Sequence, residues 1–277
     1  MTQPVTVHRD IVVSQVEGYR PLAADAYVPA GGARVACVYL HGGGWRVGSR
    51  REGPGRPGAG SARLFLRAAE RGLAVISADY RLSGEARFPA QLHDVSAACA
   101  WVVEQGPDLG IDVRRLCLWG VSAGGQLAAL RGLDLDAAPA VDAVVLWYPV
   151  TDLLSLPDDV EGVGGTPDRG PGSRESRLLG ATPDQAPDLA REASPALRAR
   201  PGAPPFLLLH GDADDLVPAR QSERLAAALR AAGGRAELEL VPGQGHMFAG
   251  MAVEELAGHV DRSVDFLLSA AGRPAHE

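Results

Sequence analysis

Short strand-like runs that alternate with helical stretches constrain the fold of this chain more than any other feature. The strand-like runs lie at residues 35–40, 73–78, 115–119, 143–147, 206–209 and 236–241. The stretches with helical composition lie at residues 62–71, 91–104, 123–130, 219–232 and 253–268. Strands separated by helices form βαβ units, so the pattern predicts an α/β fold: a mostly parallel sheet of about eight strands, flanked by helices.

The first part of the chain and two irregular stretches depart from this rhythm. We expect residues 11–16 and 24–28 to pair as an antiparallel hairpin at the sheet edge. Residues 151–203 are rich in Pro, Gly and charge, and a segment of that length is usually functional or carries its own helices. The stretch RREGPGRPGAG, at residues 50–60, predicts a mobile loop.

The length of 277 residues and a hydrophobic content of 46% suffice for one α/β domain with a full core. We therefore expect residues 1–277 to form a single domain, with 151–203 as a small cap or insertion over the carboxyl edge of the sheet. Four leucines are the expected apolar anchors of that cap, namely Leu178, Leu179, Leu189 and Leu197.

The charge and composition of the chain argue against two classes of binding partner, nucleic acids and membranes. The net charge of −7 disfavours binding to a nucleic-acid backbone. No run approaches the roughly 18 apolar residues of a membrane span, and MTQPVTVHRD lacks the pattern of a secretory signal. We expect a cytoplasmic protein with no membrane partner, and a homodimer is compatible with the sequence.

The cysteines and acidic residues give no sign of a cofactor. Cys37, Cys99 and Cys117 are too few and too widely spaced for a disulfide framework or a zinc site. Each lies in an apolar stretch, so we expect three buried thiols in a reducing compartment. Neither a metal nor another cofactor is predicted.

The sharpest chemical signal is Gly120-Val121-Ser122-Ala123-Gly124, which follows a predicted strand and precedes a predicted helix. A strand-to-helix turn this tight forces its middle residue into a strained backbone and presents the side chain at the carboxyl end of the sheet. Ser122 is therefore a candidate nucleophile. A serine that caps the helix in a glycine-rich turn is the alternative interpretation.

A serine hydroxyl needs a base, and His246 is the best placed of the seven histidines. It lies in the glycine-hinged segment PGQGH after the last predicted strand, at the edge of the sheet where α/β sites lie. His41 and His210 each end a strand and precede Gly, so we expect structural roles. The remaining four lie near the termini or in predicted helices: His8, His93, His259 and His276.

The loop after His210 offers Asp212, Asp214 and Asp215 as the carboxylate that would orient His246. A serine, then an aspartate, then a histidine is the order of the α/β-hydrolase fold. The three aspartates lack the regular spacing of oxygen ligands, so they do not predict a cation site.

An oxyanion hole would combine the backbone N–H of Ala123 with donors from the run His41-Gly42-Gly43-Gly44-Trp45. This run is no dinucleotide-binding loop, because Gly42, Gly44 and Val47 do not complete G-x-G-x-x-G. Trp45 would either wall the substrate pocket or pack behind the loop.

Five motifs in order resemble one enzyme group: HGGGW, DYRLSGEARFPAQLHD, GVSAGG, HGDADDLVP and PGQGHMF. They resemble α/β-hydrolase esterases of the hormone-sensitive-lipase and acetyl-xylan or feruloyl-esterase-like group, over about residues 35–267. The resemblance implies that Ser122 is the nucleophile, Asp214 the orienting carboxylate and His246 the base. It also implies that Gly42 and Gly43 donate to the oxyanion.

The same resemblance gives Asp94 a structural role, as a partner of Arg81 or of a backbone group near the oxyanion loop. Asp212 is expected to brace its own loop. The insert at 50–60 departs from the short linker of the family, which bears on substrate preference rather than on the chemistry.

The function implied is a serine carboxylester hydrolase that forms an acyl-enzyme on short-acyl or small aromatic esters. An aryl-formamidase and a biosynthetic acyl-transfer, elimination or cyclisation enzyme would need the same groups. A homologue that only binds a ligand is a further alternative.

Overall fold

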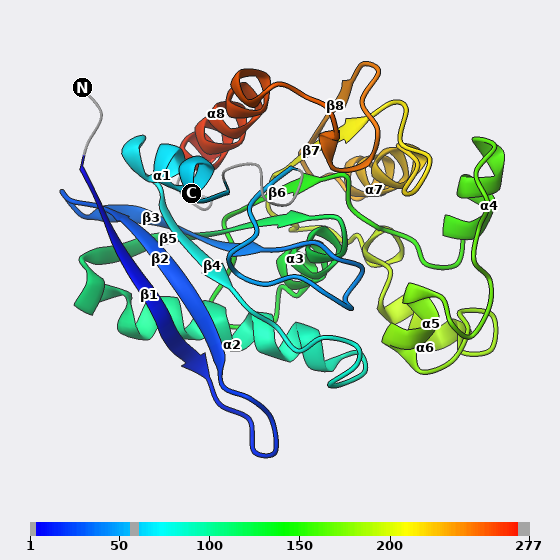
Figure 1. Cartoon of the computed structure of the whole chain (residues 1–277), viewed down its shortest axis with the longest axis horizontal. Helices are drawn as coiled ribbons and strands as arrows, with labels where there is room; N and C mark the ends of the chain where they lie inside the picture. Colours follow the sequence, from blue (N-terminus) through cyan, green and yellow to red (C-terminus); the bar gives the residue numbers. More distant parts are fainter. Residues whose placement is uncertain (1–3, 56–60, 271–277) are drawn as a thin grey trace.

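A computed structural model describes residues 4–55 and 61–270, whose strands and helices alternate along the chain (Figure 1). The strands are β1 (Val5–Ser14), β2 (Leu22–Pro29), β3 (Ala33–Leu40), β4 (Ala74–Ala78), β5 (Ile111–Val121), β6 (Ala143–Trp147), β7 (Phe206–Gly211) and β8 (Ala236–Val241). The α-helices are α1 (Ser61–Glu70), α2 (Ala90–Gln105), α3 (Ala123–Leu133), α4 (Leu156–Gly162), α5 (Arg174–Leu179), α6 (Pro187–Glu192), α7 (Arg220–Ala231) and α8 (Val253–Ala270). Short 3-10 helices are η1 (Gly106–Leu109), η2 (Pro195–Leu197) and η3 (His246–Phe248).

One eight-stranded sheet runs through the molecule in the order β1-β2-β4-β3-β5-β6-β7-β8. Strand β2 pairs antiparallel with both β1 and β4, and all other neighbours are parallel. The predicted mostly parallel sheet and the hairpin at its edge are therefore confirmed. Strands β1 and β5 begin earlier than predicted, because their first residues alternate between exposed and half-buried positions and do not form an apolar run.

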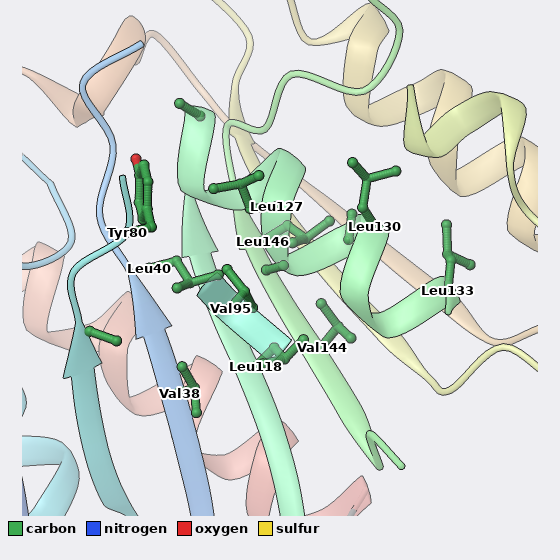
Figure 2. Close-up of a cluster of buried hydrophobic side chains, with 14 of the residues drawn as sticks. Val38, Leu40, Tyr80, Val95, Leu118, Leu127, Leu130, Leu133, Val144 and Leu146 are labelled. Carbon is green, nitrogen blue, oxygen red and sulfur yellow. The ribbon is translucent and has the colours of Figure 1, made fainter. Parts of the chain in front are cut away.

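Alternate residues of the central strands are buried on opposite faces of the sheet, which explains the continuous apolar runs. One face packs against α2, α3 and α7, with Leu118 and Val144 at its centre. The other packs against α1 and α8, with Trp119 and Trp147 at its centre. Figure 2 shows the first of these clusters, in which side chains of α3 such as Leu127 meet those of the strands.

All three cysteines lie in these cores and are free thiols. Cys37 and Cys117 are paired in register on the neighbouring strands β3 and β5, and Cys99 lies on α2. Burial raises the pKa of Cys99 to about 11, so this thiol stays protonated near neutral pH. The expectation of buried apolar cysteines is confirmed.

Residues 151–203 form α4, α5, α6 and η2, which lie together at one end of the sheet (Figure 1). Leu178 and Leu179 are buried as expected, and Leu189 is packed against the core while partly exposed. The expectation for Leu197 is wrong, because its side chain is 45% exposed. It follows Ala196 on η2, and that short turn buries the alanine and faces the leucine outward.

Residues 50–55 form a loop, as predicted, and residues 56–60 lie outside the described part. Arg50 is ion-paired with Asp10, Asp25 and Asp79, and its carbonyl accepts a hydrogen bond from the Ser77 hydroxyl. Gly53 to Gly55 are buried. Glycine and proline content predicted the loop, and the structure adds that one arginine ties it to β2 and β4.

Within residues 4–55 and 61–270, no helix combines the length and apolar character that crossing a membrane requires. In the same two ranges, no three His, Cys, Asp or Glu side chains gather as metal ligands would.

Asp94 is paired with Arg81, as the resemblance implied. The guanidinium donates to both carboxylate oxygens over 2.7–3.0 Å, and the Arg81 backbone N–H donates to Oδ2. Both side chains are at least nine-tenths buried. The pair joins the loop after β4 to Asp94, the fifth residue of α2.

We predict that Asp94→Ala destabilises the fold by about 3–5 kcal/mol, because it leaves a buried guanidinium without its partner. Asp112→Ala is the matched control, since the Asp112–Arg114 pair is more than half exposed on both sides. The Asp112→Ala substitution should lower the free energy of unfolding by less than about 1 kcal/mol. Urea unfolding followed by circular dichroism measures both, and equal losses would contradict the structural role of Asp94.

Candidate active site

The tight turn between β5 and α3 holds Ser122 at the carboxyl end of the sheet. Ser122 has φ 51° and ψ −120°, a strained backbone for a residue with a side chain. A Cβ on Gly120 would lie 2.2 Å from the Gly124 carbonyl oxygen, and one on Gly124 would lie 2.3 Å from that of Leu40. Only glycine fits at both positions. Ser122 forms no capping bond to α3, so the alternative of a plain helix cap is not supported.

His246 approaches Ser122 from the loop after β8. The distance from Ser122 Oγ to His246 Nε2 is 2.9 Å, and His246 Nδ1 lies 2.7 Å from Asp214 Oδ2. The carboxylate accepts from Nδ1, which leaves Nε2 free to accept the serine proton. The ring of Tyr148 packs edge-on against the imidazole, with 5.0 Å between centroids.

Asp214 is fixed by the backbone of its own loop. Its Oδ1 accepts hydrogen bonds from the N–H groups of Leu216 and Val217, which leaves Oδ2 for His246. Burial alone would raise the pKa of Asp214, but hydrogen bonds from His210, His246 and the Val217 backbone hold it well below its usual value. Asp214 is therefore ionised at any pH near neutrality.

The other two aspartates of this loop, Asp212 and Asp215, differ from Asp214 in their contacts and exposure. Asp212 accepts a hydrogen bond from the Gly243 N–H over 2.6 Å, so it braces its own loop against that of His246, as predicted. Asp215 is exposed. His210 precedes this loop in the chain. Its Nε2 donates to the Val217 carbonyl, and its Nδ1 accepts from the Ser222 hydroxyl. Both contacts agree with the structural role expected of His210.

His41 is also structural. Its ring is buried and stacks on Tyr80 with 4.4 Å between centroids, and the Tyr80 hydroxyl donates to the His41 carbonyl. His8, His93 and His259 contact neither Ser122 nor Asp214 among the hydrogen bonds of the described residues. His276 lies outside those residues.

The predicted oxyanion residues border Ser122. A Cβ on Gly42 would lie 3.3 Å from the Ser122 Cβ, so the backbone of the two residues is in close contact. Gly43 has φ +110° and uses its carbonyl to accept from Arg46 and Val47. Ala123 opens α3, where backbone N–H groups have no helical partner. Gly43 borders both cavities that Ser122 borders, and Ala123 borders the larger of them.

Trp45 packs behind the glycine loop. It borders the cavity beside Ser122, but its side chain is 1% exposed. Its indole N–H donates to the Gln126 side chain, which in turn donates to the Ala193 carbonyl. The geometry favours the packing role over the predicted substrate contact, since the ring links the glycine loop to α3 and to the 151–203 segment.

Two cavities meet at Ser122. The larger one, about 320 Å³, extends toward α4 and α5 and is bordered by Arg46, Arg174 and Glu175. The smaller one, about 200 Å³, is mostly apolar and is bordered by Val47, Tyr148, Met247, Gly55 and Glu52. Burial raises the pKa of Glu52. The described end of the 50–60 insert thus reaches the site.

Sequence reasoning missed Tyr148, Met247 and Arg174. Tyr148 follows β6 at the carboxyl edge, and that position was a signal available in the sequence. Met247 directly follows His246 and adopts φ 62°, which no pattern indicated. Arg174 lies across Gly44, where a Cβ would be 2.5 Å from its Cδ. The third glycine of HGGGW therefore makes room for an arginine of the 151–203 segment.

The comparisons with known proteins agree with this arrangement. The model of the BD-FAE family matches residues 24–229, which is most of the chain. This chain belongs to the BD-FAE family. The resemblance to α/β-hydrolase esterases is thereby confirmed.

Individual relatives carry esterase names. Esterase LipC of Mycobacterium tuberculosis is 33% identical over 76% of this chain and 52% of its own length. A truncated carbohydrate esterase from gut microbiota superposes with a TM-score of 0.82, at 26% identity, over 98% of both chains. Esterase 2 of Thermogutta terrifontis, solved with propionate bound, gives 0.72 at 27% identity, over 100% of this chain and 97% of its own. The chain spans about half the length of the curated relatives it matches.

We predict that His41 makes the stability of this BD-FAE member fall in mild acid. Burial lowers the pKa of His41 to about 4, below its unfolded value of about 6.5. Between these values the unfolded chain binds the proton and the folded chain does not, so acid favours unfolding. Linkage gives a loss of about 2 kcal/mol between pH 7 and pH 5.

Urea unfolding of the wild type and of His41→Gln at both pH values measures this loss. The variant should lose about 2 kcal/mol less than the wild type on acidification. The same pH dependence in both proteins would contradict the assignment. Since the comparison is made within each protein, any constant destabilisation by the substitution cancels.

Proposed function

We propose that the protein is a serine carboxylester hydrolase that forms an acyl-enzyme on Ser122. One observation supports this most strongly: an unbroken row of hydrogen-bonding groups, Ser122 Oγ to His246 Nε2 at 2.9 Å and His246 Nδ1 to Asp214 Oδ2 at 2.7 Å. The esterase names of the relatives point to the same reaction class.

In the proposed reaction Ser122 Oγ attacks the ester carbonyl carbon while His246 Nε2 takes its proton. Hydrogen bonds from the N–H groups of Gly42, Gly43 and Ala123 would stabilise the negative charge that develops on the carbonyl oxygen. His246 then gives its proton to the leaving alcohol. Water, deprotonated by the same imidazole, hydrolyses the acyl-serine. The ionised Asp214 fixes the tautomer and stabilises the imidazolium.

The smaller cavity supports a preference for short acyl groups. Its volume of about 200 Å³ and its apolar walls next to Gly42 and Gly43 suit an acetyl to butyryl chain. The larger cavity on the other side of Ser122 would then take the alcohol portion. The propionate bound by the Thermogutta terrifontis esterase is a short acid of the same kind.

Ser122→Ala should lower kcat/KM for p-nitrophenyl acetate by about 10³-fold or more and abolish labelling by a fluorophosphonate. Ser155→Ala is the control, because that hydroxyl lies in the 151–203 segment and does not border the two cavities at Ser122. Labelling of Ser122→Ala at the wild-type rate would exclude the proposed nucleophile.

Asp214→Asn should lower kcat by about 10³- to 10⁴-fold, because an amide favours the wrong imidazole tautomer. Asp212→Asn keeps an oxygen that can accept from Gly243 and should retain most of the activity. If the losses were exchanged between the two variants, Asp212 would be the orienting group.

On p-nitrophenyl acetate, butyrate and octanoate, kcat/KM should be highest for acetate or butyrate. We expect an octanoyl chain to fit the cavity bordered by Tyr148 and Met247 less well than a short chain, since that cavity is the smaller of the two at Ser122. A preference for octanoate would contradict the small acyl site. Efficient cleavage of N-formylkynurenine with negligible ester turnover would instead favour an aryl-formamidase, and labelling of Ser122 without any turnover would favour a biosynthetic acyl-transfer, elimination or cyclisation enzyme.

A further inference from the structure

A further hollow lies beside the larger cavity at Ser122, separated from it by the exposed side chain of Arg46. It has a volume of about 590 Å³ and shares Arg46 with that cavity. We call it the arginine groove and define it by its polar lining, namely Arg46, Arg87, Arg177, Ser83, Thr182 and Gln185. Among the described residues, no Asp or Glu side chain lines it.

This absence of acidic residues is notable in a chain whose net charge is −7. The acidic residues nearest in the sequence are engaged or directed elsewhere: Glu85 is ion-paired with Arg20, and Asp184 borders a different cavity. Within residues 4–55 and 61–270, none of the three groove arginines forms an ion pair with a carboxylate. Their positive charge is therefore available to a ligand.

The walls of the groove are held in place. The Phe88 N–H donates to the Leu178 carbonyl over 2.9 Å, which joins the loop after β4 to helix α5 (Figure 1). Arg87 lies across Gly180, where a Cβ would be 2.6 Å from its Cδ. Arg177 donates from Nε to the Gly172 carbonyl, so its terminal nitrogens remain for a ligand. The side chains of Arg87 and Arg177 are both exposed, so a ligand can reach their guanidinium groups.

We infer that the arginine groove binds the alcohol portion of the ester, and that this portion is polyhydroxylated and carries carboxylate groups. The inference rests on the proposed ester hydrolysis at Ser122. If the short acyl group occupies the small apolar cavity, the alcohol portion leaves through the larger cavity and passes Arg46. Guanidinium groups bind carboxylates, while Ser83, Thr182 and Gln185 suit hydroxyl groups.

The test compares acetate release from acetylated tetragalacturonate and from acetylated xylotetraose, which has the same number of sugar units and no carboxylate. The wild type should prefer the anionic oligomer in kcat/KM, and 0.5 M NaCl should reduce that preference. In the double variant Arg87→Gln/Arg177→Gln, the ratio of kcat/KM on the anionic oligomer to that on the neutral one should fall about tenfold. Its turnover of p-nitrophenyl acetate should stay within about twofold of the wild type, because that substrate is too short to reach the groove.

Two further variants sharpen the test. Arg87→Lys/Arg177→Lys keeps both charges and should retain most of the preference. Arg198→Gln removes an exposed arginine of the same segment outside the groove and should change nothing. Equal rates on both oligomers in the wild type, or a preference that the double Gln variant retains, would overturn the inference. Absence of turnover on p-nitrophenyl acetate as well would instead count against ester hydrolysis itself.

Discussion

Close backbone packing around Ser122 is the constraint on which the rest of the site depends. The serine keeps a left-handed backbone, which costs on the order of 1–3 kcal/mol and persists only where the surroundings dictate it. These surroundings include two close backbone contacts. A Cβ on Gly120 would collide with the Gly124 carbonyl oxygen, and a Cβ on Gly124 would collide with that of Leu40. Because β3 and β5 are neighbours in the sheet, this contact also brings the glycine run after β3 against the serine.

The glycine run itself is held by contacts with residues outside it. The Tyr80 hydroxyl donates to the first carbonyl of the run, that of His41, and five residues beyond the run Arg50 pairs with three aspartates. Trp45 fixes its middle through Gln126. A buried arginine with several carboxylate partners is a costly feature unless its geometry is good. Here Arg50 joins the chain that follows the glycine run to β2 and to Asp79, the residue after β4.

The fold and the residues around Ser122 could be predicted because each depends on local sequence. Parallel strands read as apolar runs, and a tight turn after a strand demands glycine at fixed positions, so β3 to β8 and the Gly120–Gly124 turn were visible. His246 and Asp214 followed from their places after strands together with the resemblance to a family. The boundaries of β1 and β5 were not visible, since polar residues on a half-exposed face carry no strong periodicity.

What the sequence could not provide are contacts between distant segments. Glu52 and Gly55 reach the small cavity because the Gly55 N–H donates to the hydroxyl of Tyr148, 93 positions away. Composition alone predicted a loop here and gave no sign of this contact. Leu197 failed as an anchor for a related reason, because the direction of a side chain on a one-turn helix depends on tertiary packing.

The fit of Arg174 over Gly44 bears on how this enzyme scaffold can change. The 151–203 segment and the glycine run are shaped to each other, since any side chain at position 44 would occupy the space of the arginine stem. The segment is therefore not an interchangeable module. A chimera that received this segment from another esterase would inherit a gap above Gly44 unless the donor also brought a long side chain at position 174. A side chain at position 44 would require Arg174 to move, so a substitution at either position bears on the other.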